Sequence, residues 1–530
     1  MRRAAVGVAA AVALLVPSVA HATAAHDAAL ARKGITHAVA KQWVKPPDAY
    51  RYRSAVTRAL RDVKTLPKLR AYVLASQLSQ LSPFWDSYTS PRALALFSQL
   101  EVNLDYFETH RVPTTRVDVA DEDGVVYRWF PRLGLEFHPL ANFGALNAAA
   151  AAEDVESTRT LADALLARAI PRGTRLIWEY QFRFAGGRPP WASGMAQAVA
   201  AQALARSYAL LQDPVLSAAA VRAYASVPPF LLPLASGPWI RLYGFNSQVV
   251  LNAQLQAIVS LLEYAQTSGD GEASALAAQL SASAQALFPR FDTGDWSRYQ
   301  LGGAYATREY QTFVTDLLAK LAKLTQDPFW VDASKRFRAY LTVAPQVTPG
   351  PATPAVWPQP LDGYLDTAQI QFTLSQRASV TLAIGGDVTT YRLGPGARTL
   401  TWTPPEGLAP GTYPVQIATS NYAGKKATFK LAPVVVRWDT APPTITAASL
   451  AGTTLNWQAD DPGTPWLALA VDYADPAGVN PPQTQDLGQQ PTGGTIGLAV
   501  PPGTWQATLR ATNSAGLTTA YPLGTITQPG

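Results

Sequence analysis

Tyrosines next to tryptophan, arginine or glutamate recur at four places in the middle of the chain. The four segments read LIWEYQFRF, WIRLYGFNSQVVLN, FDTGDWSRYQL and TREYQTFVTDLL. Each falls in an expected loop or at the first turn of an expected helix. A phenol with an ordinary pKa of about 10 can donate a proton, and its phenolate accepts one when it is stabilised. The pattern indicates proton transfer if these places meet; core packing is the alternative for any one of them.

Other kinds of catalytic site have little support. The chain has no cysteine, which excludes disulfides, a cysteine nucleophile and thiolate metal sites. No two of the 5 histidines have metal-ligand spacing, and none accompanies a serine elbow. A glycine-rich phosphate loop is also missing. The net charge of +6 comes from scattered basic residues without interleaved aromatics, so nucleic acid is not the expected partner.

One acidic turn is a candidate cation site. Asp118, Asp121, Glu122 and Asp123 lie within the segment RVDVADEDGVVYRWFP. Their carboxylates could together hold a calcium ion, although their spacing matches no regular calcium loop. The alternative is a solvated acidic turn. No other metal and no cofactor is expected.

The elements that must position the tyrosines are helices. Apolar residues recur three and four apart over 26–110, and again from about 140 to 343. Between these segments, 111–139 alternates, turns at Asp123-Gly124 and alternates again, which predicts a β-hairpin. The expected helices of the second segment are 192–211, 215–226, 247–267, 271–288, 306–325 and 328–341. Repeated helix pairs predict an all-α (α/α) toroid over 140–343, completed by 26–110, with helix ends facing one cleft.

The pattern changes in the last third of the chain. A proline-rich stretch, PQVTPGPATPAVWPQPL, predicts a stiff linker over 344–361. Short alternating segments follow, and GTY with a later NYAG recurs as GTW with a later NSAG at a constant offset. Two β-sandwich domains, 362–440 and 441–530, are expected, each resembling an immunoglobulin-like fold.

The N-terminus indicates secretion. Arg2 and Arg3 precede an apolar run from Ala4 to Val19 and then the small-x-small sequence Ala20-His21-Ala22. This order predicts a signal peptide over 1–22. The run is too short to anchor the chain in a membrane, and no later stretch is long and apolar enough. The mature protein is therefore expected outside the cell or in its envelope.

At this point the chain resembles a known family. PPWASGMAQAVAAQALARSYAL, VVLNAQLQAIVSLLEYA, FDTGDWSRYQL, YQTFVTDLLAKL and WVDASKRFRAYL occur in the same order as in the C-terminal domain of D-glucuronyl C5-epimerases. LGLEFHPLANFGALNA resembles the segment before that domain. The resemblance covers about 120–343. It implies inversion at carbon 5 of glucuronate residues within a polysaccharide.

The resemblance also implies roles for individual residues. The functional tyrosines of the family fall on Tyr243, Tyr299 and Tyr310, with Tyr299 and Tyr310 as the proton-transfer pair and Tyr243 as a positioning hydroxyl. The remaining implied roles are carboxylate clamps at Arg188, Arg241 and Arg298, sugar orientation by Asn252, and aromatic platforms at Trp191, Trp239 and Trp296. Trp191 precedes an expected helix capped by Ser193, so it is expected in the wall of the cleft.

The chain departs from the family pattern at several positions. The family has an acidic pair before its first tyrosine, where this chain has Arg241 and Leu242. The expected carboxylate base is thus missing, and Glu309 and Glu179 are the candidates to replace it. Gln300 stands where the family has an aspartate after the second tyrosine, and the histidine-containing stretch after the third is absent.

The sequence is therefore compatible with three functions. The leading one is a secreted epimerase-like protein acting on a uronic-acid polysaccharide. A polysaccharide lyase would form the same carbanion and then expel the C4 substituent. A non-catalytic glycan-binding protein of the cell surface is the third.

Overall fold

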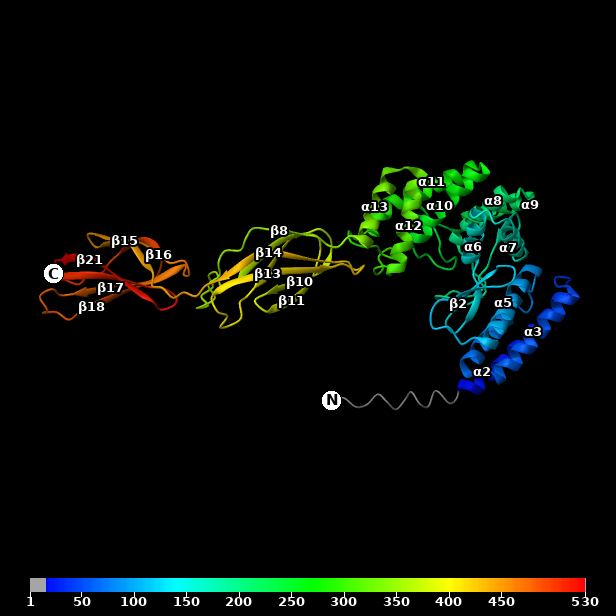
Figure 1. Ribbon diagram of the computed structural model, residues 1–530, viewed down its shortest axis with the longest axis horizontal. Helices are drawn as coiled ribbons and strands as arrows, with labels where there is room; N and C mark the ends of the chain where they lie inside the picture. The colour runs from blue at the N-terminus through cyan, green and yellow to red at the C-terminus, as the bar shows by residue number, and fades with distance from the viewer. Residues whose placement is uncertain (1–15, 530) are drawn as a thin grey trace. The chain divides into compact units, whose positions relative to one another are not determined.

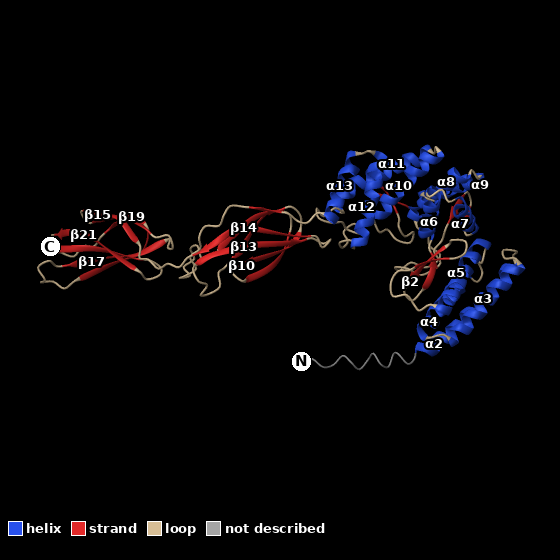
Figure 2. Cartoon of the chain, in the orientation of Figure 1, coloured by secondary structure: helices blue, strands red, loops and turns tan. Residues whose placement is uncertain are grey.

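The computed structural model describes residues 16–529. The chain forms two compact units, one ending at Ala339 and the other starting at Tyr340. The first unit is mainly helical and the second consists of strands and loops (Figures 1 and 2). Most of the predicted signal peptide lies outside the described residues, and its last residues belong to the first helix described.

Four helices open the described part of the first unit. They are α2 (Val16–Ala40), α3 (Pro46–Thr65), α4 (Lys68–Leu81) and α5 (Ser90–Thr109). The first three pack against one another, and α5 packs on α3 and α4. Proline in the first turn of α3 and α5 fits helix starts, because the first amides of a helix have no partner within it. A short 3-10 turn, η1 (Ser82–Phe84), follows α4.

The region predicted as a hairpin forms a three-stranded antiparallel sheet in the order β1-β2-β3. Its strands are β1 (Asp118–Ala120), β2 (Val126–Phe130) and β3 (Gly134–Phe137). Buried amides attach it to the helices: the Asn103 side chain donates to the Leu135 carbonyl and accepts from the Leu135 N–H. The sheet therefore joins the first helices to those that follow.

Eight further helices form pairs. They are α6 (Pro139–Ala151), α7 (Val155–Ala167), α8 (Gly194–Leu211), α9 (Pro214–Tyr224), α10 (Leu251–Ser268), α11 (Gly271–Leu287), α12 (Arg308–Thr325) and α13 (Pro328–Thr342). The even-numbered helices α6, α8, α10 and α12 contact one another in that order, while α7, α9 and α11 pack behind them. We call α6, α8, α10 and α12 the inner helices.

The inner helices run in the same direction. The Asn147 side chain near the end of α6 donates to Gln202 of α8, and Arg206 of α8 pairs with Glu263 near the end of α10. At the other end, the amide of Asn252 in the first turn of α10 donates to Tyr310 in the first turn of α12. Equivalent turns thus meet, and the N-termini of all four helices lie at one end of the unit.

Short elements fill the links between helices. They are β4 (Ile170–Arg172), β5 (Arg175–Ile177), β6 (Leu231–Leu234), β7 (Gly237–Ile240), η2 (Pro228–Phe230) and η3 (Phe288–Arg290). β4 pairs with β5, and β6 with β7, as two-stranded hairpins. The expected helix boundaries hold to within a few residues, since capping residues such as Ser193, Asp213, Asp270 and Thr307 mark the starts.

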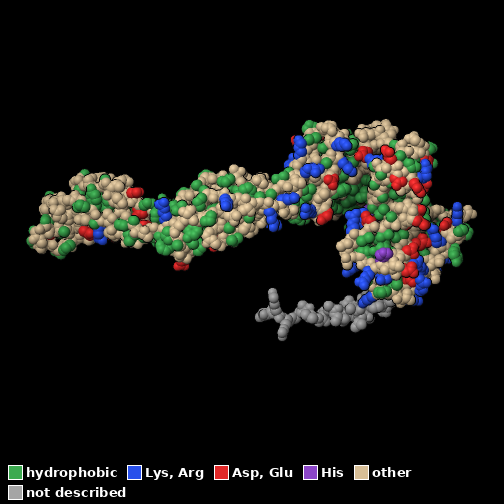
Figure 3. All heavy atoms as spheres, viewed as in Figure 1, with side chains coloured by type: hydrophobic (Ala, Val, Ile, Leu, Met, Phe, Trp, Pro, Cys, Tyr) green, Lys and Arg blue, Asp and Glu red, His purple; other side chains and the backbone are tan. Residues whose placement is uncertain are grey.

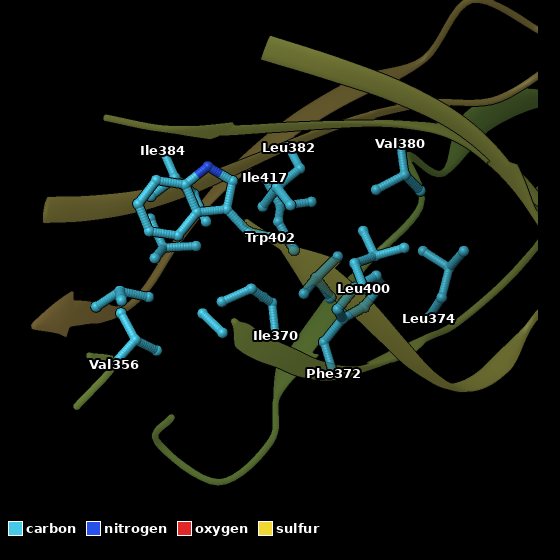
Figure 4. Packing of buried hydrophobic residues seen from close by; sticks show 14 of the residues in the cluster. Val356, Ile370, Phe372, Leu374, Val380, Leu382, Ile384, Leu400, Trp402 and Ile417 are labelled. Carbon is cyan, nitrogen blue, oxygen red and sulfur yellow. The ribbon is translucent and has the colours of Figure 1, made fainter. Parts of the chain in front are cut away.

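The second unit begins with two sheets that share one core. The strands are β8 (Val347–Pro349), β9 (Ala368–Leu374), β10 (Ala378–Ile384), β11 (Asp387–Leu393), β12 (Gly396–Trp402), β13 (Gly411–Ser420) and β14 (Lys426–Val436). Their orders are β11-β10-β13-β14 and β12-β9-β8. Alternate residues of both sheets, such as Ile370 and Val380, point into the space between them (Figure 4). This alternation is the pattern that predicted a sandwich.

The second sandwich repeats this arrangement. Its strands are β15 (Thr444–Ala451), β16 (Thr454–Asp460), β17 (Trp466–Ala474), β18 (Gln483–Pro491), β19 (Gly493–Gly497), β20 (Gly503–Thr512) and β21 (Thr518–Gln528). The orders are β15-β16-β19 and β18-β17-β20-β21. The repeated Asn421 and Asn513 occupy equivalent turns, each accepting from the backbone N–H four residues later. Both side chains also donate to the segment that enters their domain.

The predicted linker 344–361 is wrong as a separate element. Val347 lies in β8, and Val356 forms a parallel bridge with Val436. Both valines are buried in the core of the first sandwich. The many prolines around these two valines made the segment look like a linker. Burying the valines in the sandwich core is more favourable than leaving them exposed to solvent. Within residues 16–529, no helix is long and apolar enough to cross a membrane.

Candidate active site at the inner-helix N-termini

Aromatic side chains gather where α8 begins. Trp191 stacks on Tyr180 with ring centroids 4.0 Å apart and an interplanar angle of 2°. The indole N–H donates to the Phe182 carbonyl at 2.8 Å, and Trp191 is only 7% exposed. It packs with Phe182 and Tyr180 as one buried cluster. Trp191 therefore lies in the wall at the start of α8. Its predicted role as a platform is wrong, because it offers no open face for a sugar to stack on.

Close backbone contacts bring the Tyr243 segment to this wall. The Gly194 amide donates to the Arg241 carbonyl at 3.0 Å, and the Gly244 amide donates to the Ala192 carbonyl at 2.8 Å. A Cβ atom on Gly194 would lie 2.6 Å from the Phe230 side chain, and one on Gly244 would lie 2.8 Å from the Ala192 carbonyl. Only glycine permits this approach. As a result, the Tyr243 ring lies 5.9 Å from that of Trp191.

The three tyrosines predicted to act together do lie together. The Tyr310 hydroxyl donates to the Tyr299 carbonyl and accepts from the Asn252 N–H, both at 3.0 Å. The rings of Tyr299 and Tyr310 are 4.9 Å apart, edge to face. The Tyr243 side chain lies close enough to that of Tyr299 for the two phenols to affect each other's ionisation. Residues from three separate loops and helix starts thus form one group, which we call the tyrosine cluster.

Burial sets the protonation of this cluster. It raises the pKa of Tyr310 well above the ordinary 10.0, against the opposing effect of the Asn252 N–H. Burial also raises the pKa of Tyr243, and the neighbouring Tyr299 phenol adds to the shift. Both phenols are therefore protonated at neutral pH, so at rest they are proton donors rather than bases.

Two residues that adjoin the cluster, one along the chain and one through a backbone hydrogen bond, each have a buried side-chain polar atom without a hydrogen-bond partner among the described residues. These atoms are Nε of Arg241 and Oδ1 of Asn252. Arg241 lies two residues before Tyr243, and the Asn252 amide binds Tyr310. A buried polar atom without a partner costs about 1–3 kcal/mol. A ligand carrying an acceptor for Arg241 and a donor for Asn252 would remove that cost.

The comparison with known families bears on this site. Residues 172–339 match the family model described as D-glucuronyl C5-epimerase C-terminus. Those residues are therefore similar to the C-terminal domain of D-glucuronyl C5-epimerases. The matched range contains the whole tyrosine cluster, and we call it the epimerase domain below.

Solved structures of low identity also match. Cel10, a family 8 glycosyl hydrolase endoglucanase from Klebsiella pneumoniae, is 14% identical with a TM-score of 0.31, over 40% of this chain and 72% of that chain. Cellobiose 2-epimerase from Bacillus thermoamylovorans B4167 is 10% identical with a TM-score of 0.34, over 48% and 73%. A D-mannose isomerase is 12% identical with a TM-score of 0.33, over 51% and 73%. At such low scores, the family match remains the finding that bears on function.

The other two arginines predicted as clamps are placed differently from Arg241. Arg298 donates to the Gly303 carbonyl and lies over the Tyr305 ring, 5.7 Å from its centroid. Its guanidinium therefore holds the 297–305 loop of the epimerase domain. Arg188 is exposed in the loop before α8. Of the three, Arg241 alone combines a position close to the cluster along the chain with an unpartnered buried nitrogen.

The predicted platforms Trp239 and Trp296 are wrong. Both are fully buried, at 0% exposure. The Trp239 indole donates to the Val250 carbonyl at 3.3 Å, and the Trp296 indole to the Ala306 carbonyl at 2.9 Å. Both indoles are therefore packed inside the epimerase domain. Their N–H groups are hydrogen-bonded to backbone carbonyls, as is usual for buried tryptophans.

Neither carboxylate expected to replace the missing base is in position to act. Glu179 is buried between Arg92 and Arg172, with N–O distances of 2.9 and 3.0 Å. Glu309 is exposed in the first turn of α12, where its own backbone amide and Thr307 lower its pKa. The first is a structural ion pair and the second stays ionised in solvent. The sequence does not show that one carboxylate is buried in an ion pair and the other is exposed, because burial depends on tertiary neighbours.

The acidic turn does not gather as a cation site. Asp118 pairs with Arg128 at 2.7 and 2.8 Å, and Asp121 accepts from the amides of Asp123 and Val125. No group of three or more acidic or histidine side chains in the described part of the chain is placed to hold a metal ion. The turn borders an open cavity of about 900 Å³ between α5 and α7. The calcium suggestion is therefore wrong: these oxygens already serve Arg128 and the turn backbone.

Sequence reasoning missed a groove along the inner helices. A cavity of about 270 Å³ is lined by Gln202, Arg206 and Glu263, with Lys320 and Phe313 from α12. The face of the helical unit in view is hollowed, with hydrophobic side chains in the hollow (Figure 3). The spacing of Met195, Val199, Gln202 and Arg206, on one side of α8, was the signal available. The alanines around them make every side of this helix apolar, so the sequence alone does not single out this side.

Proposed function

We propose that this protein epimerises uronic acid residues of a polysaccharide at carbon 5. The observation that carries the proposal is the convergence of Tyr243, Tyr299 and Tyr310 within a domain similar to the C-terminal domain of D-glucuronyl C5-epimerases. Arg241, two residues before Tyr243, adds a cation with a free N–H. Removing a proton next to a carboxylate leaves an enolate-like anion, which such a cation stabilises.

In this reaction the proton leaves one face of carbon 5 and another returns to the opposite face. Tyr310 is the donor that returns it, because burial keeps its phenol protonated. Tyr299, whose ring contacts that of Tyr310, removes the first proton as a phenolate and becomes a neutral phenol, while Tyr310 gives up its proton and becomes the phenolate. Each turnover leaves the two tyrosines with exchanged protonation, which the reverse reaction or solvent restores. Arg241 binds the substrate carboxylate and Asn252 a sugar hydroxyl.

The proposal also includes the fold class of each unit and the location of the protein. The paired helices together with α2–α5 are proposed as an α/α toroid, and the two sandwiches as immunoglobulin-like modules. The arginines and apolar run before residue 20, together with Ala20-His21-Ala22, favour secretion. A uronate polymer outside the cell is the matching substrate.

Solvent exchange tests the reaction directly. The full-length protein is incubated in deuterium oxide with heparosan and with alginate, and deuterium at C5 is measured by NMR. Exchange without chain cleavage is expected on one of them. Unsaturated sugar absorbing in the ultraviolet would instead identify a lyase, and binding without either reaction would identify a glycan-binding protein. Both results would overturn the proposal.

The tyrosine assignments are tested in the same assay. Tyr310→Phe and Tyr299→Phe should each reduce exchange at least about 100-fold, the usual contribution of a positioned acid or base. Tyr50→Phe is the control, because Tyr50 is 78% exposed on α3. Circular dichroism checks that the variants fold. Exchange at the wild-type rate in both cluster variants would show that these assignments are incorrect.

A further inference from the structure

The groove along the inner helices is built from one face of each helix. On α8 it is lined by Met195, Val199, Gln202 and Arg206, which are spaced to lie on one side over about three turns. α6, α10 and α12 contribute the remaining lining residues, including Asn147, Glu263 and Lys320. The cavity is therefore a feature of the helix packing and not of a mobile loop.

One end of the groove lies about one helical turn from the tyrosine cluster. Gln256, which lines it, lies one turn after Asn252, and Phe313 lies three residues after Tyr310. Glu263 marks the other end, and the rise of about 1.5 Å per residue puts it roughly 16 Å along α10 from Asn252. A chain bound at the cluster would pass Gln256 and Phe313 before reaching Glu263.

The far end of the groove holds an ordered polar network. Glu263 accepts hydrogen bonds from both Arg206 and Gln202. Gln202 in turn accepts from Ser260 at 2.8 Å and from Asn147 at 3.3 Å. Oδ1 of Asn147 is buried and has no partner among the described residues. The network thus fixes the charged pair and leaves one acceptor for a hydroxyl donor.

Lys320 and Phe313 complete the lining on α12. Lys320 is exposed and has no hydrogen bond or ion pair within residues 16–529, whereas Arg206 is compensated by Glu263. The ionised groups lining the groove are Arg206, Lys320 and Glu263, so its net charge is positive. Phe313 is 39% exposed and lines the groove. An exposed ring suits the apolar face of a sugar.

We infer that this groove binds a second acidic sugar of the same chain, several residues from the one that reacts. Lys320 binds its carboxylate and Asn147 accepts from one of its hydroxyls, while Phe313 packs on a sugar ring nearer the tyrosine cluster. A neutral glycan would meet the same ring and amides but would leave Lys320 without a counter-charge. The inference rests on the proposed function for the identity of the polymer, and it extends that function to a longer substrate.

Binding measured separately from reaction tests it. Isothermal calorimetry with the full-length protein uses a glucuronate-containing hexasaccharide from heparosan and neutral cellohexaose as probes. Lys320→Gln is expected to lower the affinity for the acidic hexasaccharide about five-fold, which corresponds to the loss of one exposed ion pair. The affinity for cellohexaose should not change. Lys323→Gln is the matched control, since Lys323 is exposed on α12 but does not line the groove. Phe313→Ala should weaken both probes.

The outcomes separate this inference from the proposed reaction. Equal affinities of Lys320→Gln and Lys323→Gln for the acidic probe would overturn the groove assignment even if C5 exchange occurs. A loss specific to Lys320→Gln would support it even if no exchange is found. Equal loss of both probes in Lys320→Gln would also contradict it, because a lysine that binds a carboxylate must discriminate by charge.

Discussion

Arg241 and Arg298 illustrate how the same side chain serves two purposes in one site. Arg298 is bound to the Gly303 carbonyl and lies over Tyr305, so its role is to hold a loop. Nε of Arg241 is buried without a partner two residues before Tyr243. A side chain whose polar atoms are hydrogen-bonded within the protein stabilises the fold. A buried polar atom without a partner lowers the free energy of unfolding and is left available to bind a ligand. The two arginines therefore predict opposite mutational effects.

Arg241→Gln should lower the rate of C5 exchange about 100-fold, as expected when a donor to a developing anion is removed. Its free energy of unfolding should change by less than about 1 kcal/mol, because no Nε hydrogen bond is lost. Deuterium exchange and thermal unfolding measure the two effects. Arg298→Gln is the control, with lower stability expected because the contacts to Gly303 and Tyr305 are lost. If Arg241→Gln is unstable and Arg298→Gln inactive but stable, the roles are reversed.

Among the elements, α4, α5 and β3 meet around a buried carboxyl. Glu136 is 0% exposed, and its Oε1 accepts from the side chains of Gln77 at 2.9 Å and Gln80 at 2.8 Å. Oε2 has no partner among the described residues. Burial raises the pKa of Glu136 from 4.5 to about 7, so the folded protein prefers the neutral acid. The attachment of the first helices to the sheet therefore depends on pH.

The effect of pH has a definite sign. Below the unfolded value of 4.5 the carboxyl is protonated in both states, and between 4.5 and about 7 only the unfolded chain loses the proton. The free energy of unfolding should therefore fall by about 3 kcal/mol as pH rises through this interval. Glu136→Gln keeps the accepting oxygen and should abolish this slope. Urea unfolding at several pH values measures it, and an identical slope in the variant would contradict the assignment.

On the scale of the whole molecule, all residues of the tyrosine cluster belong to the helical unit. The chain divides between Ala339 and Tyr340, and the sandwiches of the second unit have cores of their own. Each unit thus buries its own apolar surface, which is the requirement for independent folding.

A chain ending at Val343, just after α13, should fold and retain C5 exchange. The full-length protein should show at least two thermal transitions, and one of them should persist in the shortened protein. Calorimetry and the exchange assay test the two expectations. A shortened protein that folds without exchanging would place part of the active machinery in the β unit.

Much of this protein could be predicted from local patterns. The 3.6-residue period and caps such as Ser193 and Thr307 determine the helices, because capping and amphipathicity act within a few residues. The repeat containing Asn421 and Asn513 identified two related β domains, and the family motifs pointed to the three tyrosines. These signals need no knowledge of distant neighbours.

Only the tertiary structure decided which polar groups are available. The sequence made Glu179 a candidate base, but in the structure it forms ion pairs with Arg92 and Arg172. It made Trp296 a candidate platform, but the ring is fully buried. The groove formed by Arg206, Glu263 and Lys320 joins three helices that are far apart in sequence. Burial and pairing are long-range properties: they depend on what packs against a residue, and its sequence neighbours do not encode that.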